Sequence, residues 1–98
     1  MELAIDTSTG IASIALSQQG EVIVELTWYA ERNHTVELLP SVVNLLHQAK
    51  TDFSSIGGII VARGPGSFNG LRVGISTAKG LAFALALPLV GISTLEVE

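Results

Sequence analysis

The fold of this chain is decided by the stretch IIVARGPGSFNGLRVG, which runs from Ile59 to Gly74. Its first four residues are all apolar, which is typical of a parallel strand buried on both faces. A glycine-rich turn follows at once and enters an apolar helix that we expect over residues 69–87. Such turns often serve only to supply unusual backbone angles, but a strand, a turn and a helix N-terminus also present free backbone N–H groups. The turn therefore shapes the helix entry and offers candidate contacts to a ligand or partner at Gly64, Gly66, Ser67 and Gly70.

Three further strands are predicted at the start of the chain. Residues 2–7 and 11–17 are joined by a short turn, and residues 21–29 alternate apolar with polar side chains, which predicts an antiparallel meander. A helix should run from His34 or Thr35 to Lys50, with Asn33 as its N-cap. Pro40 falls inside it and should either bend this helix or delay its start.

Both helices carry more apolar surface than one core face needs. The first is apolar over about half of its circumference, against the ~100° that a core-facing stripe requires. The second is apolar nearly all round, and its small residues would let another helix approach closely. We therefore predict a partner surface formed by Leu38, Leu39, Val42, Leu45 and Leu46 on the first helix and by Val73, Thr77, Gly80 and Ala84 on the second.

The composition predicts that part of the apolar surface is covered by a partner, and it argues against nucleic acid as a direct partner. The 98 residues permit one domain, only 14% of them are charged, and the mean hydropathy is +0.54. A net charge of −4 with scattered Lys and Arg argues against a direct grip on nucleic acid. The absence of cysteine excludes disulfides and thiolate chemistry and is compatible with the cytoplasm. No signal peptide is predicted, because the acidic Glu2 and Asp6 interrupt the apolar start of the chain. No membrane span is predicted either, because the apolar residues 80–92 are too few and are interrupted by Pro88.

Four segments together resemble the TsaB family, also called YeaZ: residues 4–8, 33–40, 64–74 and 79–82. Asn69 stands where that family usually has threonine. The resemblance implies the ribonuclease-H-like half of the actin, Hsp70 and hexokinase (ASKHA) fold. This is an α/β architecture whose mixed sheet combines a three-stranded antiparallel meander with parallel strands and two helices.

The family usually has a second half of the same plan, so residues 1–98 would be its N-terminal domain without the C-terminal half. A short last strand at residues 89–91 is followed by a capping box at Ser93 and Glu96, which predicts the start of another helix. We therefore expect the chain to be one half of a longer protein.

The resemblance also implies a function. The chain would be a scaffold that binds a TsaD-like catalytic subunit through its two helices and contacts a TsaE-like ATPase. The assembly would place threonylcarbamoyl on adenosine 37 of tRNAs, with tRNA held only indirectly and ATP used at the level of the complex. Alone, the chain would form a homodimer.

Two other classes of function stay open at this point. Asp6, Thr7 and Ser8 stand where kinases of the superfamily place a phosphate-binding hairpin, which would make the chain an ASKHA phosphotransferase or ATPase. Ser8 replaces the glycine that lets the backbone approach phosphate, so a vestigial hairpin is the better interpretation. A plain structural module without a specific partner is the other alternative.

No catalytic or metal-binding set is predicted. TsaD relatives carry two metal-binding histidines four residues apart, and the resemblance puts Thr94 and Glu98 at those positions, which leaves no metal site. His34 and His47 lie too far apart on one helix to share an ion. Nothing supplies a nucleophile, a base and an orienting group, so the older description of this branch as a glycoprotease is disfavoured.

Overall fold

The computed structural model describes residues 1–7, 11–29, 34–64 and 68–93. Its elements follow the predicted order, and their bounds differ from the predicted ones by at most two residues. They are β1 (Glu2–Asp6), β2 (Ile11–Gln18), β3 (Glu21–Tyr29), α1 (His34–Gln48), the 3₁₀ turn η1 (Phe53–Ser55), β4 (Gly58–Gly64), α2 (Phe68–Leu85) and β5 (Leu89–Ser93).

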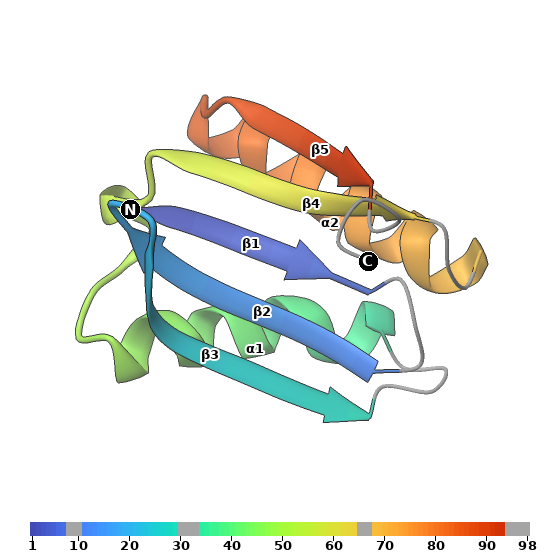
Figure 1. Ribbon diagram of the computed structural model, residues 1–98, viewed down its shortest axis with the longest axis horizontal. Coiled ribbons are helices and arrows are strands. Elements are labelled where there is room, and N and C mark those ends of the chain that lie inside the picture. Colours follow the sequence, from blue (N-terminus) through green and yellow to red (C-terminus); the bar gives the residue numbers. More distant parts are fainter. Residues whose placement is uncertain (8–10, 30–33, 65–67, 94–98) are drawn as a thin grey trace.

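The strands form one mixed sheet in the order β3-β2-β1-β4-β5 (Figure 1). The first three strands pair antiparallel, as a meander does, with Ile5 opposite Ile14. β4 pairs parallel with β1, where Ile5 lies beside Val61, and β5 pairs parallel with β4. Helix α1 precedes β4 and helix α2 connects β4 to β5, as parallel pairing requires. The sheet is therefore mixed, as expected from the sequence.

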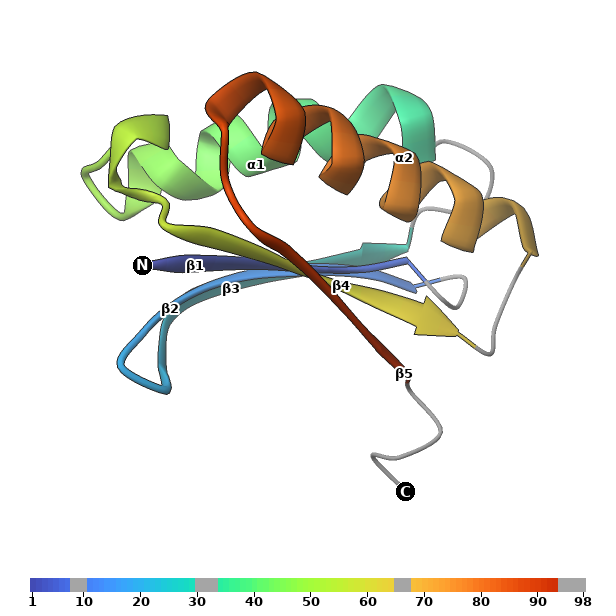
Figure 2. The same cartoon turned by 90° about the horizontal axis from the view of Figure 1, so that it is seen from above.

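Both helices lie on the same face of the sheet (Figure 2). Alternation along β1 turns Leu3 and Ile5 toward them, and Ile59 and Val61 of β4 point the same way. The hydrophobic core lies between the sheet and the helices. Its buried members are Leu3, Ile5, Ile14, Leu16, Leu38, Val42, Leu45, Leu46, Ile56, Ile59, Val61, Ala78 and Ala82.

The predicted partner surface on α1 is wrong for most of its residues. The side chains of Leu38, Val42, Leu45 and Leu46 are at most 2% exposed and belong to the core. Their spacing of three and four residues places them on one side of the helix, and this is the side that packs on the sheet. Of the five predicted residues on α1, Leu39 is exposed.

Helix α1 begins at His34 and continues through Pro40 to Gln48, so the alternative of a later start is excluded. Its predicted N-cap, Asn33, lies outside the described residues. Helix α2 ends at Leu85, two residues before the predicted end. Ala86 adopts a left-handed conformation with a φ of 56°, and the Leu87 N–H donates to the Ala82 carbonyl at 2.8 Å. This Schellman-type end terminates α2 before Pro88 is reached.

A close contact holds α2 against the end of β1. Thr7, directly after β1, is 1% exposed, and Gly74 of α2 is buried beside it. A Cβ atom on Gly74 would overlap the Thr7 hydroxyl and would stand in ordinary van der Waals contact with Cβ and Cγ2 of that residue. Glycine at position 74 is therefore what permits the helix to approach the strand this closely. The contact also joins two of the four segments that carry the family resemblance, residues 4–8 and 64–74.

The assignment of α1 to the core can be tested with two leucines on this helix. We expect Leu45→Ala to lower the free energy of unfolding by roughly 2–5 kcal/mol, because it leaves a cavity among buried side chains. Leu39→Ala removes an exposed side chain and should change it by no more than ~0.5 kcal/mol. Urea unfolding followed by circular dichroism measures both values. Equal losses in the two variants would contradict the assigned orientation of α1.

The contact between Gly74 and Thr7 can be tested with a matched pair of glycines in α2. Gly74→Ala should destabilise the protein by roughly 1–3 kcal/mol, because its methyl group overlaps Thr7. Gly80→Ala is the control, since nothing lies within 4 Å of its added Cβ. It should stabilise the helix by roughly 0.5–1 kcal/mol. In a Thr7→Ala background the cost of Gly74→Ala should fall, and an undiminished cost would contradict a steric cause.

The N-terminus of η1 gives a prediction of pH dependence. The Ser54 hydroxyl and the Ser54 backbone N–H both donate to Asp52 Oδ1, the latter at 3.0 Å. These two bonds, the side-chain one first, hold the pKa of Asp52 below its ordinary value. A lowered carboxyl pKa favours the folded state above the unfolded pKa, and this contribution is lost as the pH falls through the folded pKa.

Carbon-detected NMR titration of the carboxyl group should show the pKa of Asp52 rising toward its ordinary value in Ser54→Ala. Ser55→Ala is the control, because the Ser55 hydroxyl donates at 2.9 Å to the Asp52 backbone carbonyl and not to its carboxylate. An equal rise in both variants would mean that the Ser54 hydroxyl is not the cause.

Candidate functional site

The described residues of the predicted phosphate hairpin, Asp6 and Thr7, do not point toward one ligand site. Successive side chains of a strand point to opposite faces, so Asp6 and Thr7 diverge at the end of β1. Thr7 is buried under α2 against Gly74, which leaves it unavailable to a ligand and corrects its assignment to a ligand hairpin. Ser8, the third residue of the prediction, lies outside the described residues.

Asp6 is half-buried, and strand alternation places its side chain on the sheet face opposite the one that carries Leu3 and Ile5. It lies opposite Ser13 of β2, and Ser13 lies opposite Thr27 of β3. The Thr27 hydroxyl donates to the Ser13 hydroxyl at 3.4 Å, and Asp6 itself has a partner within the chain. These three residues form a polar row across three strands.

The glycine-rich stretch links β4 to α2 as predicted. Gly64 ends β4, and Gly70 lies in the first turn of α2, which begins at Phe68. Gly66 and Ser67 lie outside the described residues. Contact of this turn with a ligand or a partner therefore stays a prediction.

The outer sides of the two helices form the more extensive candidate site. On α1, Leu39 is 44% and Val43 50% exposed; on α2, Phe83 is 89% exposed. Gly80 and Ala84 of α2 are also exposed, and they lie within one helical turn of Phe83. The two helices contact each other. We call Leu39, Val43, Gly80, Phe83 and Ala84 the outer helix surface. It combines branched and aromatic side chains with two positions small enough for close helix approach.

Sequence reasoning found part of this surface. It included Leu39, Gly80 and Ala84, whereas Thr77 is half-buried and the side chain of Val73 lies outside the described residues. It missed Val43 and Phe83. The signal for both was their spacing: Val43 follows Leu39 by four residues, and Phe83 follows Gly80 by three.

The described part of the chain shows neither a metal-binding cluster nor a membrane-spanning helix. No three side chains of His, Cys, Asp or Glu come together there. Thr94 and Glu98 lie outside it, so the loss of the metal site stays a prediction. No helix among the described residues is long and apolar enough to cross a membrane.

Comparison with known proteins identifies the family. The family model for TsaD, tRNA N6-adenosine threonylcarbamoyltransferase, matches residues 12–98. The tRNA threonylcarbamoyladenosine biosynthesis protein TsaB of Bacillus subtilis is 42% identical over 96% of this chain, and that of Escherichia coli 43% identical over 95%. These alignments cover 41% and 40% of the two relatives, so the chain spans about two fifths of their length.

Solved structures give the same answer. YeaZ from Pseudomonas aeruginosa superimposes with a TM-score of 0.87 at 40% identity, over 94% of this chain and 43% of that one. RuvC from Thermus thermophilus superimposes with a TM-score of 0.60 at 10% identity, over 98% of this chain and 65% of that one, which shows a shared fold alone. The ribonuclease-H-like fold expected from the sequence is thus confirmed, and the chain belongs to the TsaB (YeaZ) family, which is related to TsaD.

Proposed function

We propose that this chain is part of a non-catalytic scaffold in the biosynthesis of threonylcarbamoyladenosine at position 37 of tRNAs. It binds a TsaD-like catalytic subunit through the outer helix surface. The names of its relatives support the pathway, since the TsaB proteins of Bacillus subtilis and Escherichia coli are both called tRNA threonylcarbamoyladenosine biosynthesis proteins. The exposed apolar side chains on two adjacent helices are the observation that carries the scaffold role.

The outer helix surface has the properties of a protein interface. Phe83 is 89% exposed, although a solvent-facing phenylalanine contributes little to the stability of its own chain. Aromatic side chains dominate the energetics of interfaces when a partner covers them. Gly80 has open space around its Cα, which lets a partner helix lie close over α2. An antiparallel or crossed helix pair from the TsaD-like subunit would complete a helix bundle.

The non-catalytic role rests on the chemistry of the described residues. Thr7 is 1% exposed, so its hydroxyl is not accessible to a reacting substrate. A net charge of −4 also favours indirect contact with tRNA, through the partner subunit. Contact with a TsaE-like ATPase, use of ATP at the level of the complex, homodimer formation without the partner and a cytoplasmic location belong to the same proposal.

Substitutions on the outer helix surface test the proposal. Phe83→Asp and Leu39→Asp should each weaken binding to the TsaD-like protein of the same organism by at least ~10-fold, because they place a desolvated charge in an apolar interface. Gly80→Leu should act similarly by blocking close approach, and the chain itself has room for this side chain. Isothermal titration calorimetry measures the affinities, and multi-angle light scattering measures the stoichiometry.

Val22→Asp is the matched control. Val22 is an exposed apolar residue (61%) that lies on β3 instead of a helix, so this variant should bind normally. Circular dichroism should show that all four variants fold. Undiminished binding by the three helix variants would disprove the interface, and a protein that remains monomeric and indifferent to the TsaD-like subunit would disprove the scaffold role.

A further inference from the structure

We infer that a cavity between α2 and the β4–β5 edge of the sheet binds a small amphipathic carboxylate. Lys79 would pair with the carboxylate, and three branched apolar side chains would hold the hydrocarbon tail. This inference goes beyond the proposed function, because the cavity shares no residue with the outer helix surface.

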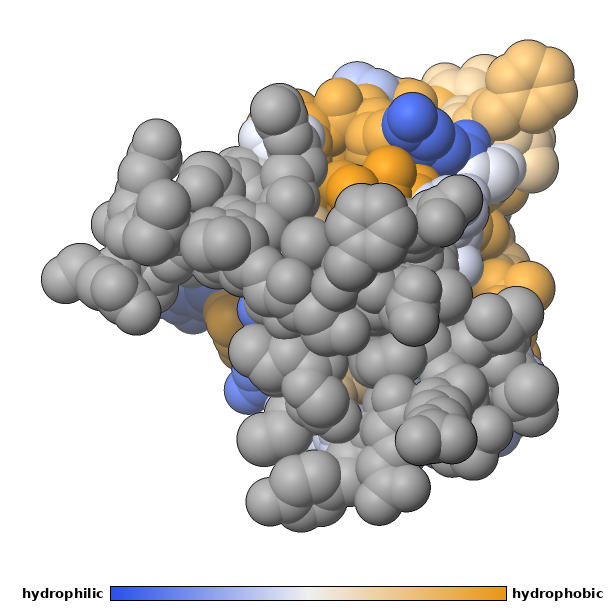
Figure 3. All heavy atoms as spheres, turned by 90° about the vertical axis from the view of Figure 1, so that its right-hand side faces the viewer, coloured by the Kyte–Doolittle hydropathy of each residue, from blue (hydrophilic) through white to orange (hydrophobic). Residues whose placement is uncertain are grey.

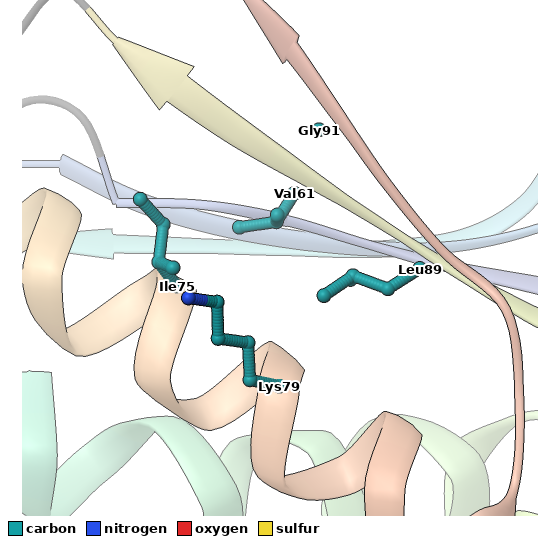
Figure 4. A pocket seen from close by; sticks show the side chains of 5 residues that line it. All are labelled: Val61, Ile75, Lys79, Leu89 and Gly91. Carbon is teal, nitrogen blue, oxygen red and sulfur yellow. The ribbon is translucent and has the colours of Figure 1, made fainter.

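The cavity is of a size suited to a small molecule. Its volume is about 340 Å³, it is partly open to solvent, and it is lined by Val61, Ile75, Lys79, Leu89 and Gly91. Ligand pockets generally measure ~300–1,000 Å³, so this one lies at the lower end of that range. Figure 4 shows Ile75 and Lys79 extending from α2, with Val61 and Leu89 opposite them on β4 and β5.

The register of β4 and β5 explains why the walls of the cavity are apolar. Leu89 and Gly91 alternate along β5 on the face that meets α2, and Gly91 lies beside Val61 of β4. A side chain at position 91 would point into the same space. Glycine there leaves the volume empty, while Val61, Ile75 and Leu89 supply methyl groups around it.

Among the described residues that line the cavity, Lys79 is the charged one. Its side chain is exposed, and Figure 4 shows the amine close to Ile75, one helical turn earlier. The ion pair found among the described residues joins the N-terminal amine to Glu2 at 3.7 Å, so Lys79 has no carboxylate partner in that part of the chain. The space-filling view likewise shows hydrophilic side chains set in a hydrophobic area above the grey residues, at the end of the molecule that it faces (Figure 3).

Apolar walls beside one unpaired ammonium group select one class of ligand. A purely polar anion would leave the methyl groups uncovered, and a neutral hydrocarbon would leave the ammonium group unpaired. An amine would be repelled by Lys79. A monocarboxylate with a short hydrocarbon tail satisfies both parts of the cavity at once.

The cavity and the outer helix surface adjoin along α2. Phe83 follows Lys79 by four residues and so lies on the same side of the helix, whereas Gly80 and Ala84 lie on another. At ~100° per residue, Lys79 and Ala84 are separated by more than a third of the circumference of the helix. None of the described residues that line the cavity belongs to the outer helix surface, but a partner that covers Phe83 would lie beside a ligand in the cavity.

Titration of the ¹⁵N-labelled protein with sodium acetate, butyrate and hexanoate tests the inference. Saturable shifts of the Val61, Leu89 and Gly91 amide signals are expected, with affinity rising roughly fourfold per added methylene until the tail fills the cavity. Hexanol and hexylamine should bind more weakly than hexanoate. The peptide N-acetyl-Gly-Gly-Leu, which carries the same terminal chemistry, distinguishes a free small molecule from a peptide C-terminus.

Charge variants test the role of Lys79. Lys79→Gln should weaken hexanoate binding by about fivefold, the upper value for a solvent-accessible ion pair, and Lys79→Arg should retain it. Lys50→Gln is the matched control, because it removes the same charge from a lysine that does not line the cavity. Hexanol binding should be the same in the Lys79→Gln protein and in the unmodified one.

Five outcomes would overturn the inference. The first is the absence of saturable shifts at these amides. The second is equal affinity for acetate and hexanoate, which would mean general attraction of anions. The third is equal affinity for hexanol and hexanoate, and the fourth is an equal effect of Lys79→Gln and Lys50→Gln on hexanoate binding; either would remove the pairing with Lys79. The fifth is tighter binding of the peptide than of hexanoate, which would assign the cavity to a protein partner.

Discussion

The arrangement of this domain depends on the contact between Gly74 and Thr7. It lets α2 approach the end of β1 closely enough for the buried Thr7 to pack directly against the helix. With this end of α2 fixed, Ala78 and Ala82 follow at intervals of four residues and meet the sheet with small side chains. The positions of the cavity beside β5 and of the outer helix surface both follow from how α2 is held here.

Helix α2 explains how a sequence that is apolar nearly all round can belong to a surface helix. A helix of this composition usually lies within a core. Here its circumference is divided: Ala78 and Ala82 face the sheet, Ile75 and Lys79 face the cavity, and Phe83, four residues after Lys79, extends from the neighbouring surface into solvent. The cavity and the exposed surface around Phe83 account for apolar side chains that the core does not need. We therefore connect the apolar composition of α2 with binding as well as with folding.

Sequence periodicity predicted the strands and helices to within two residues, because strand alternation and helical spacing are local properties. The mixed sheet itself was expected from the family resemblance. Periodicity could not orient α1, whose apolar stripe was wide enough to contain both the core side and an outer side. Leu46 and Leu39 look alike in such a pattern, and only the packing of α1 on the sheet separates them. The cavity was out of reach for a similar reason. It requires Leu89 of β5 and Ile75 of α2 to lie together, and this follows from tertiary structure.

The two apolar features of α2 also differ in what they ask of a partner. The outer helix surface is convex around Phe83, carries no formal charge and draws on both helices, which suits another protein surface. The cavity is concave and small, and its described lining carries one ammonium group, which suits a molecule with one negative charge. The two features adjoin on α2, since Phe83 of the outer helix surface follows Lys79 of the cavity by four residues. A protein that covers Phe83 would therefore lie beside an anion held by Lys79, and each would border the other on the same side of this helix.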